Sequence, residues 1–550
     1  MWRYTSLVDL INVAKASLSG SLLIVAVILM THRFIGYPRS VFLLDMLLTF
    51  LFVGGVRAAI RLYYARRAGL RVFPGLDRMR GGGARRLLII GAGDAAEKVI
   101  REIQGNHELD LEPVGLLDDE RGSRGKFIHG VPILGGTELL SASPVDFDEI
   151  LIAWSKVRGE EMRRIVELCE RTGRPFRTVP AMSELIDGRV TVKSVRQVRV
   201  EDLLGRNELH LDEDEIARYL RGQRVLVTGA GGSIGSELVR QIGRFTPEAL
   251  ALFEISELNL FRAEMDVRRL FPDLGVTPYL GDIRDAVAVD RVFSGFRPQA
   301  VFHAAAYKHV PMQEVFPWEA VHNNVLGTLN LVTAARDEGV ERFVLVSTDK
   351  AVWPTNVMGA TKRVAEMFVE CLNNESATRF MAVRFGNVME SSGSAIPVFR
   401  DQIARGGPVT VTHPEVARYF MSVGEAAQLI LQAGAIGQGG EIFVLEMGKP
   451  IRILDLVKDM IRLQGLEPEE DVPIKIIGLR PGEKMFEELI TEGEGIVATG
   501  RDKIMVLKGD SRRFEEIKPK IDDLLEAAQA FDAPAIKARL KELVPEYTPR

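Results

Sequence analysis

One glycine-rich turn constrains the fold of this chain more than any other segment. The turn lies within Gln223-Arg-Val-Leu-Val-Thr-Gly-Ala-Gly-Gly-Ser-Ile-Gly-Ser-Glu-Leu-Val239, which reads as a buried strand, a turn and an amphipathic helix. Its spacing is Gly-x-x-Gly-x-x-Gly, at Gly229, Gly232 and Gly235. We expect the first glycine to permit the tight turn, the second to let backbone amides approach a pyrophosphate, and the third to let the helix pack on the strand. The pattern therefore predicts a doubly wound α/β domain that directs a helix N-terminus at a dinucleotide.

An acidic residue after the next strand indicates which dinucleotide binds. The predicted strand 249–254 ends in Glu254, about twenty residues beyond the glycine turn. A carboxylate there can accept hydrogen bonds from the adenosine ribose and would repel a 2′-phosphate, so we predict NAD rather than NADP. Loops after the third and fourth strands complete the site. The predicted cofactor-binding residues are Gly229, Gly232, Ser233, Ile234, Gly235, Glu254, Asp282, Ile283, Ala304 and Ala305.

A second, weaker glycine turn lies upstream. Gly91-x-Gly93-x-x-Ala96 follows an apolar strand and opens a helix, but this loose form of the pattern is weak evidence for a bound cofactor. Strands and helices continue to alternate up to residue 180. We predict a separate Rossmann-like domain over residues 84–180, whose ligand the sequence does not identify.

Length and composition narrow the possible classes. The chain has 550 residues, enough for roughly three or four domains. Its 70 Lys and Arg against 75 Asp and Glu give a net charge of −5, which argues against a general nucleic-acid-binding protein. Cys169 and Cys371 form no C-x-x-C pair, so neither a disulfide scaffold nor a thiolate zinc site is expected. His303 and His309 show no metal-ligand spacing, and we predict no metal.

The N-terminus is strongly apolar. Residues 16–30 and 41–56 are apolar runs separated by a short polar turn, and each is a little shorter than the roughly 20 residues that cross a bilayer. We predict two transmembrane helices within residues 1–71, with a signal peptide or a buried hairpin as alternatives. Arginines over 57–71 would lie on the cytoplasmic side. These features predict a multi-pass protein of the inner membrane with cytoplasmic catalytic domains.

Five motifs in the second half carry a family resemblance. They are TGAGGSIG, STDKAV-P, MGATK, VRFGNV and LRPGEK. From Gln223 to about Glu488 the chain resembles extended short-chain dehydrogenases/reductases, and most closely the membrane-bound UDP-N-acetylglucosamine 4,6-dehydratases of the polysaccharide-biosynthesis family. The resemblance, which covers nearly the whole chain, implies an NAD-binding catalytic domain over residues 222–500 with a smaller C-terminal substrate lobe. A linker over 181–221 would precede it, and a helical element over 501–550 would follow.

The sequence departs from the general superfamily at one position. Where most members have Tyr-x-x-x-Lys, this chain has Met358-Gly-Ala-Thr-Lys362, and a thioether has no proton to exchange. Acid–base work must therefore fall to other groups, and the neighbouring Asp349 and Lys350 supply one acid and one base. By resemblance, Asp349 protonates the departing C6 hydroxyl, Lys350 removes the C5 proton, Thr348 positions the sugar near C4, and Lys362 binds the nicotinamide ribose.

Cations and amides farther along complete the predicted site. An arginine can hold the diphosphate of a UDP-sugar through two hydrogen bonds. The predicted substrate-binding residues are Lys308, Asn387, Arg418, Arg480 and Glu483.

These features predict an NAD-dependent UDP-N-acetylglucosamine 4,6-dehydratase, a hydro-lyase that serves surface-glycan synthesis and is expected to form a homo-oligomer. A UDP-sugar 4-epimerase or ketoreductase on the same fold is the first alternative, although both rely on the missing tyrosine. A membrane-tethered NAD-binding sensor without catalytic activity is the second. The four site residues Thr348, Asp349, Lys350 and Lys362 argue against that loss of activity.

Overall fold

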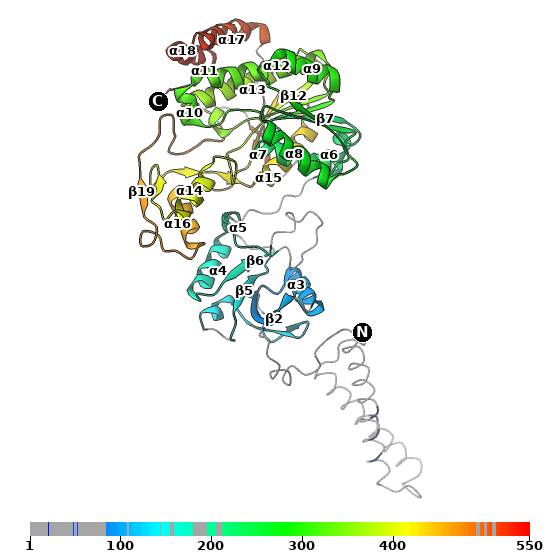
Figure 1. Cartoon of the computed structure of the whole chain (residues 1–550), viewed down its shortest axis with the longest axis vertical. Helices are drawn as coiled ribbons and strands as arrows, with labels where there is room; N and C mark the ends of the chain where they lie inside the picture. The colour runs from blue at the N-terminus through cyan, green and yellow to red at the C-terminus, as the bar shows by residue number, and fades with distance from the viewer. Residues whose placement is uncertain are drawn as a thin grey trace. The chain divides into compact units, whose positions relative to one another are not determined.

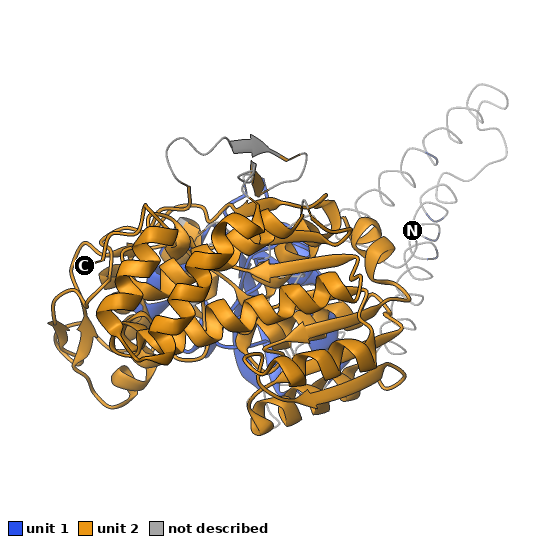
Figure 2. Cartoon of the chain, turned by 90° about the horizontal axis from the view of Figure 1, so that it is seen from above, with its two compact units in different colours: residues 1–156, 164–197 blue, residues 157–163, 198–550 orange. Residues whose placement is uncertain are grey.

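The structure is a computed structural model of the whole chain (Figure 1). It describes residues 84–549 except for 107–108, 121, 143–144, 155–158, 180–194, 205–211, 374, 491–495, 500–502 and 509–512, together with residues 20, 44, 48 and 52. The chain divides into two compact units (Figure 2). Unit 1 comprises residues 1–156 and 164–197, and unit 2 comprises residues 157–163 and 198–550.

The membrane part of the predicted fold class is corrected by the structure. In the described part of the chain, no helix is long and apolar enough to cross a bilayer. Helix α13, Val357–Asn373, has 17 residues and carries Lys362, Arg363, Glu366 and Glu370, so both its length and its charge are unsuited to a lipid environment. The predicted inner-membrane location depended on the same helices and is corrected with them. The predicted spans at 16–30 and 41–56 fall outside the described residues, apart from four isolated positions.

Unit 1 contains a six-stranded sheet in the order β3-β4-β2-β1-β5-β6. All neighbouring strands are parallel except β3 and β4, which form a short hairpin. Buried aliphatic residues of the strands pack against α3, as the alternating strand and helix pattern predicts. The elements are β1 (Arg85–Ile90), α3 (Asp94–Gly105), β2 (Leu111–Leu117), β3 (Phe127–Ile128), β4 (Val131–Gly135), β5 (Glu149–Ile152), α4 (Gly159–Arg171), of which residues 164–171 belong to this unit, and β6 (Phe176–Thr178).

Unit 2 is built on a nine-stranded sheet in the order β20-β21-β17-β12-β11-β10-β7-β8-β9. The seven strands from β17 to β9 are parallel, and β21 and β20 add an antiparallel edge. Strand order reverses between β7 and β10, which is where α/β sheets of this kind bind ligands. The strands are β7 (Arg224–Thr228), β8 (Ala249–Glu254), β9 (Gly275–Leu280), β10 (Ala300–His303), β11 (Arg342–Val346), β12 (Arg379–Arg384), β17 (Glu441–Leu445), β20 (Ile496–Ala498) and β21 (Ile504–Lys508).

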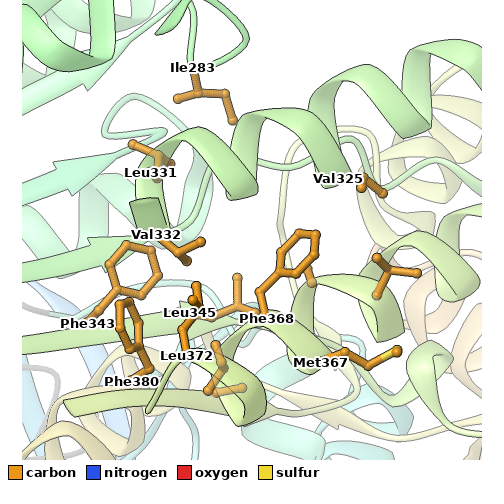
Figure 3. Packing of buried hydrophobic residues seen from close by; sticks show 14 of the residues in the cluster. Ile283, Val325, Leu331, Val332, Phe343, Leu345, Met367, Phe368, Leu372 and Phe380 are labelled. Atoms are coloured by element: carbon orange, nitrogen blue, oxygen red, sulfur yellow. The ribbon is translucent and has the colours of Figure 1, made fainter. Parts of the chain in front are cut away.

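Helices cover both faces of this sheet, so its central strands are apolar on both sides. One core packs Phe343 and Leu345 of β11 against Leu331 of α12 and Phe368 of α13 (Figure 3). The other core lies under α6, α7, α8 and α15. The helices are α6 (Glu213–Leu220), α7 (Ser233–Gly243), α8 (Glu257–Leu270), α9 (Ala286–Phe296), α12 (Gly327–Asp337), α13 (Val357–Asn373), α15 (Val423–Ile436), α17 (Phe514–Gln529) and α18 (Ala533–Leu543).

A smaller lobe of unit 2 has its own apolar core, contributed by two helices and short strand pairs. Its elements precede and follow α15 and β17 in the sequence, and it includes the loop with the LRPGEK motif. Its elements are β13 (Asn387–Val388), α14 (Ala395–Ala404), β14 (Val409–Val411), β15 (Ala417–Arg418), β16 (Phe420–Met421), β18 (Ile451–Arg452), α16 (Ile453–Arg462) and β19 (Ile474–Ile476).

Candidate active site

The glycine turn after β7 is tightly packed. Gly229 has φ +63°, and a Cβ atom there would lie 2.8 Å from the backbone nitrogen of Ala305. A Cβ atom on Gly235 would lie 2.0 Å from the carbonyl oxygen of Gly229. Gly232 precedes α7, and no side chain caps that helix. The turn therefore excludes side chains at its first and third glycines and leaves the N-terminus of α7 available for an anion.

Acidic residues lie at the end of β8 and just beyond the end of β9. Glu254 is buried, and its two oxygens accept hydrogen bonds from the backbone amides of Gly231 and Ser256, each at 3.0 Å. Its carboxylate is thus fixed at the glycine turn. Asp282 pairs with Arg284 at 2.7 Å, and the adjoining Ile283 is buried. The structure thus brings the predicted cofactor residues to the carboxyl ends of β7, β8, β9 and β10.

Three consecutive residues form a polar cluster beyond β11. The Thr348 hydroxyl donates to Oδ1 of Asp349 at 2.9 Å. Lys350 donates from Nζ to the same oxygen at 2.9 Å and to the amide oxygen of Asn387 at 3.0 Å. Asp349 is fully buried, and its Oδ2 has no hydrogen-bond partner in the described part of the chain. One oxygen of the acid is therefore held firmly, and the other is available for a further donor.

Glu487 adds a charge that the sequence reasoning missed. This carboxylate is buried, lies 3.8 Å from Nε of Arg418, and has a pKa raised by burial and by the charge of Asp349. Burial alone would lower the pKa of Lys350, but the charges of Asp349 and Glu487 outweigh it and raise that pKa. Glu487 follows Glu483 of the LRPGEK motif by four residues, and this position is the feature of the sequence that could have indicated it.

The first turns of α13 complete the site. Met358 is 3% exposed, so its thioether lies within the protein and cannot exchange protons. Lys362 is buried as well, and burial lowers its pKa to about 8. A Cβ atom on Gly359 would lie 2.1 Å from the carbonyl oxygen of Lys350. The helix with Met358 and Lys362 is therefore in direct contact with the backbone of the Asp–Lys pair.

The predicted substrate residues do not form one cluster. Arg418 is buried, and its guanidinium donates to Glu483 at 3.2 Å and to the Lys484 carbonyl at 2.7 Å. The other oxygen of Glu483 accepts from the backbone amide of Arg480 at 3.1 Å. These three residues thus bind one another, whereas Asn387 lies beside Lys350. Burial and the charge of Lys350 lower the pKa of Lys308.

In the described part of the chain, no group of three His, Cys, Asp or Glu residues could hold a metal ion, and this includes His303 and His309. His303 is buried between the hydroxyls of Thr228 and Thr328, at 2.8 Å and 3.0 Å. Those contacts hold β10 to β7 and α12.

The family profile described as "Polysaccharide biosynthesis protein" matches residues 225–509, more than half of the chain. The chain belongs to this polysaccharide biosynthesis family. A second profile, described as "CoA-binding domain", matches residues 2–180. The family match covers the glycine turn, the polar cluster after β11 and the LRPGEK loop, which are the features assembled above.

Similar proteins extend the comparison. The chain is 39% identical over 532 residues to the capsular polysaccharide biosynthesis protein CapD of Staphylococcus aureus, covering 95% of this chain and 86% of that protein. It is 34% identical over 277 residues to a UDP-glucose 4-epimerase of Rickettsia bellii, covering 49% of this chain and 78% of the epimerase. The X-ray structure of Pen from Bacillus thuringiensis is similar with a TM-score of 0.50 and 34% identity, covering 54% of this chain and 92% of Pen.

Proposed function

We propose that this chain is an NAD-dependent UDP-N-acetylglucosamine 4,6-dehydratase, a hydro-lyase that supplies a UDP-4-keto-6-deoxy-N-acetylhexosamine for surface polysaccharide. The observation that carries the proposal is the ion pair of the fully buried Asp349 with the partly buried Lys350 beyond β11, in a chain that has a methionine in place of the usual tyrosine. One acid and one base next to each other meet the needs of an elimination, because a proton leaves one carbon while a hydroxyl leaves its neighbour.

The cofactor proposal is supported by the glycine turn. Its tight packing between Gly229 and Gly235, the uncapped α7 N-terminus and the fixed carboxylate of Glu254 suit a dinucleotide with an unphosphorylated ribose. Bound NAD would accept hydride from C4 of the sugar and return hydride to C6. We assign Lys362 to the nicotinamide ribose because it lies one helical turn after Met358, on the helix that contacts the Asp–Lys pair.

Each member of the cluster then has a distinct task. Thr348 holds the sugar near C4 and orients Asp349 through their 2.9 Å hydrogen bond. Lys350, as the neutral amine, removes the C5 proton that the C4 ketone makes acidic, and later returns a proton to C5. Asp349 takes up the proton that the C4 hydroxyl loses as hydride leaves, passed through the Thr348 hydroxyl, and then donates it to the C6 hydroxyl, which leaves as water.

A UDP-sugar 4-epimerase is the second candidate, favoured by the identity to the Rickettsia bellii enzyme. The Asp349–Lys350 pair weighs against it, since an epimerase leaves the C5 proton and the C6 hydroxyl in place and needs no acid and base for an elimination. Met358 also stands where epimerases of this fold have their tyrosine.

The test is incubation of the full chain with UDP-N-acetylglucosamine and NAD, followed by mass spectrometry and absorbance of NADH. We expect a product lighter by one water and no net NADH, because hydride removed at C4 returns at C6. An unchanged mass with an inverted C4 would support the epimerase, stoichiometric NADH would indicate a simple dehydrogenase, and an unchanged sugar would support a sensor.

A further inference from the structure

A short connecting segment, residues 352–357, joins the Asp–Lys pair to α13. The LRPGEK loop holds this segment at two points, once through the backbone of the segment and once through its side chains. Nζ of Lys484 donates to the carbonyl oxygen of Val352 at 3.1 Å. The Thr355 hydroxyl donates to the carbonyl oxygen of Gly482 at 3.0 Å, as does the side-chain amide of the next residue at 3.1 Å. These contacts fix the first part of the segment.

The end of the connecting segment is held by two other parts of the chain. The backbone amide of Val357, the first residue of α13, donates to Oε1 of Glu314 at 2.7 Å. Glu314 belongs to α10 (Val310–Val315). The carbonyl oxygen of Pro354 accepts from the backbone amide of Thr548 at 2.9 Å, only a few residues from the C-terminal end of the sequence.

The second oxygen of Glu314 reaches the C-terminal helices. Oε2 accepts from Nζ of Lys537, on α18, at 2.7 Å. The Glu314 side chain is 8% exposed and that of Lys537 is 33% exposed, so the carboxylate of this ion pair is better shielded from solvent than in a surface pair. Glu314 therefore connects α18 directly to the N-terminus of α13, where a carboxylate is also favoured by the helix dipole.

The C-terminal tail packs around the same point. Tyr547 is fully buried, and its pKa is raised by burial and by the charge of Glu314. Glu546 pairs with Arg363 of α13 at 3.4 Å. Nζ of Lys541 donates to the carbonyl oxygen of Tyr547 at 2.6 Å. Tail, α18 and α13 thus meet next to the connecting segment.

We propose that Glu314, held by Lys537, is a positioning residue of the reaction, and that through this pair the C-terminal helices set the placement of Met358 and Lys362 relative to the Asp–Lys pair. The inference rests on the proposed function for its catalytic readout. Its physical basis is that Lys350 and Lys362 lie on different segments, so the connection between the segments must be rigid to keep their distance fixed. A displacement of about 1 Å between such groups can lower the rate up to about a hundredfold.

The experiment compares Lys537→Met with Lys537→Arg in the full chain. Arg539→Met is the matched control, because Arg539 lies on the same helix and pairs with Glu542 at the surface. We expect Lys537→Met to lower kcat about tenfold with little change in KM and melting temperature, and Lys537→Arg to restore most of it. Hydrogen exchange at the Val357 amide should be faster in Lys537→Met than in the control.

Glu314→Gln provides a second, independent variant, since it keeps an oxygen for the Val357 amide but loses the charge that binds Lys537. Its effect on kcat should match that of Lys537→Met, and the double variant should be no worse than either, because both remove one interaction. Unchanged exchange at Val357, or an equal loss of kcat in Arg539→Met, would overturn the inference. If the wild-type chain fails to release water from UDP-N-acetylglucosamine, the proposed function is wrong, and hydrogen exchange still decides the positioning role without any substrate.

Discussion

Asp349 and Lys350 are neighbours in the chain, yet the protein surrounds them differently. Asp349 is fully buried with one oxygen fixed by Thr348 and Lys350, whereas Nζ of Lys350 also reaches Asn387. The acid is thus oriented from the protein side, and the amine lies between the acid and the loop after β12. Such an arrangement suits groups that act on adjacent carbons of one substrate.

This separation predicts different defects in the two variants. Lys350→Met should reduce deuterium incorporation at C5 in heavy water by about 10²–10⁴-fold, the usual contribution of a positioned base. Asp349→Asn should still allow C5 exchange wherever the ketone forms, but should expel the C6 hydroxyl poorly. Met358→Leu conserves volume in a buried site and should cost far less than either. Normal C5 exchange in Lys350→Met would show that another group removes the proton.

The charge of Glu487 predicts a pH effect. Glu487 and Asp349 raise the pKa of Lys350, so its ammonium form persists to higher pH. The neutral amine becomes more abundant as pH increases, and the rate of C5 exchange should increase with it. Glu487→Gln removes one of the two negative charges and should lower the pKa of Lys350. The pH profile of C5 exchange should therefore move to lower pH in this variant. A profile that stays in place would exclude an electrostatic role for Glu487.

Lys362 should lower the stability of the folded chain, whereas in the proposed mechanism it supports activity. Its pKa of about 8, against an ordinary value of 10.5, means that the folded chain buries an ammonium below pH 8. The unfolded chain then binds more protons between pH 8 and 10.5, so stability increases over that range. Lys362→Met removes this cost and should stabilise the cofactor-free chain at pH 7 by up to about 3 kcal/mol, with the gain vanishing near pH 10.5. Urea unfolding measures it, with the exposed Lys518→Met as control.

At the scale of elements, two helical glycines should respond oppositely to alanine. A Cβ atom on Gly359 of α13 would lie 2.1 Å from the carbonyl oxygen of Lys350, which is a backbone atom and cannot move aside as a flexible side chain could. Gly359→Ala should therefore displace α13 from the Asp–Lys pair, destabilise the fold by about 1–3 kcal/mol and abolish most activity. A Cβ atom on Gly295 of α9 would make only an ordinary van der Waals contact, 3.9 Å from the hydroxyl oxygen of Tyr279, so Gly295→Ala should stabilise the fold by about 0.5–1 kcal/mol. Equal melting temperatures for the two variants would contradict the packing argument.

The sequence was most informative where local pattern and tertiary contact coincide. The strand–glycine–helix pattern predicted the α/β sheets because apolar strands and amphipathic helices are properties of short segments. Glu314 binds the backbone amide of Val357 and the side chain of Lys537, which is 223 positions away in the sequence. No periodicity in the sequence predicts such a contact. Arg418 gives a second example, because its guanidinium donates to Glu483 and to the Lys484 carbonyl, 65 and 66 positions away, and no local pattern predicts those contacts.

For the whole molecule, the interfaces within unit 2 indicate where an independent fragment should begin. Ile216 and Leu220 of α6 are fully buried in the core under α15. The Tyr219 hydroxyl also donates to the carbonyl oxygen of Leu431 at 2.9 Å. A fragment that starts at Gln223 loses all of these contacts, although it keeps the glycine turn and the polar cluster of Thr348, Asp349 and Lys350.

We therefore expect a fragment of residues 198–550 to fold and to retain dehydratase activity, and a fragment of 223–550 to be less stable by several kcal/mol. Removing two fully buried aliphatic side chains costs about 2–5 kcal/mol each when they are truncated in place. The measurement is the urea midpoint of both fragments, together with product mass and NADH absorbance. A variant of the longer fragment with Ile216→Ala should fall between the two, because it loses one buried side chain and keeps the helix. If both fragments unfold at the same urea concentration, α6 does not belong to the cooperative core of unit 2, and the unit begins at the glycine-turn strand.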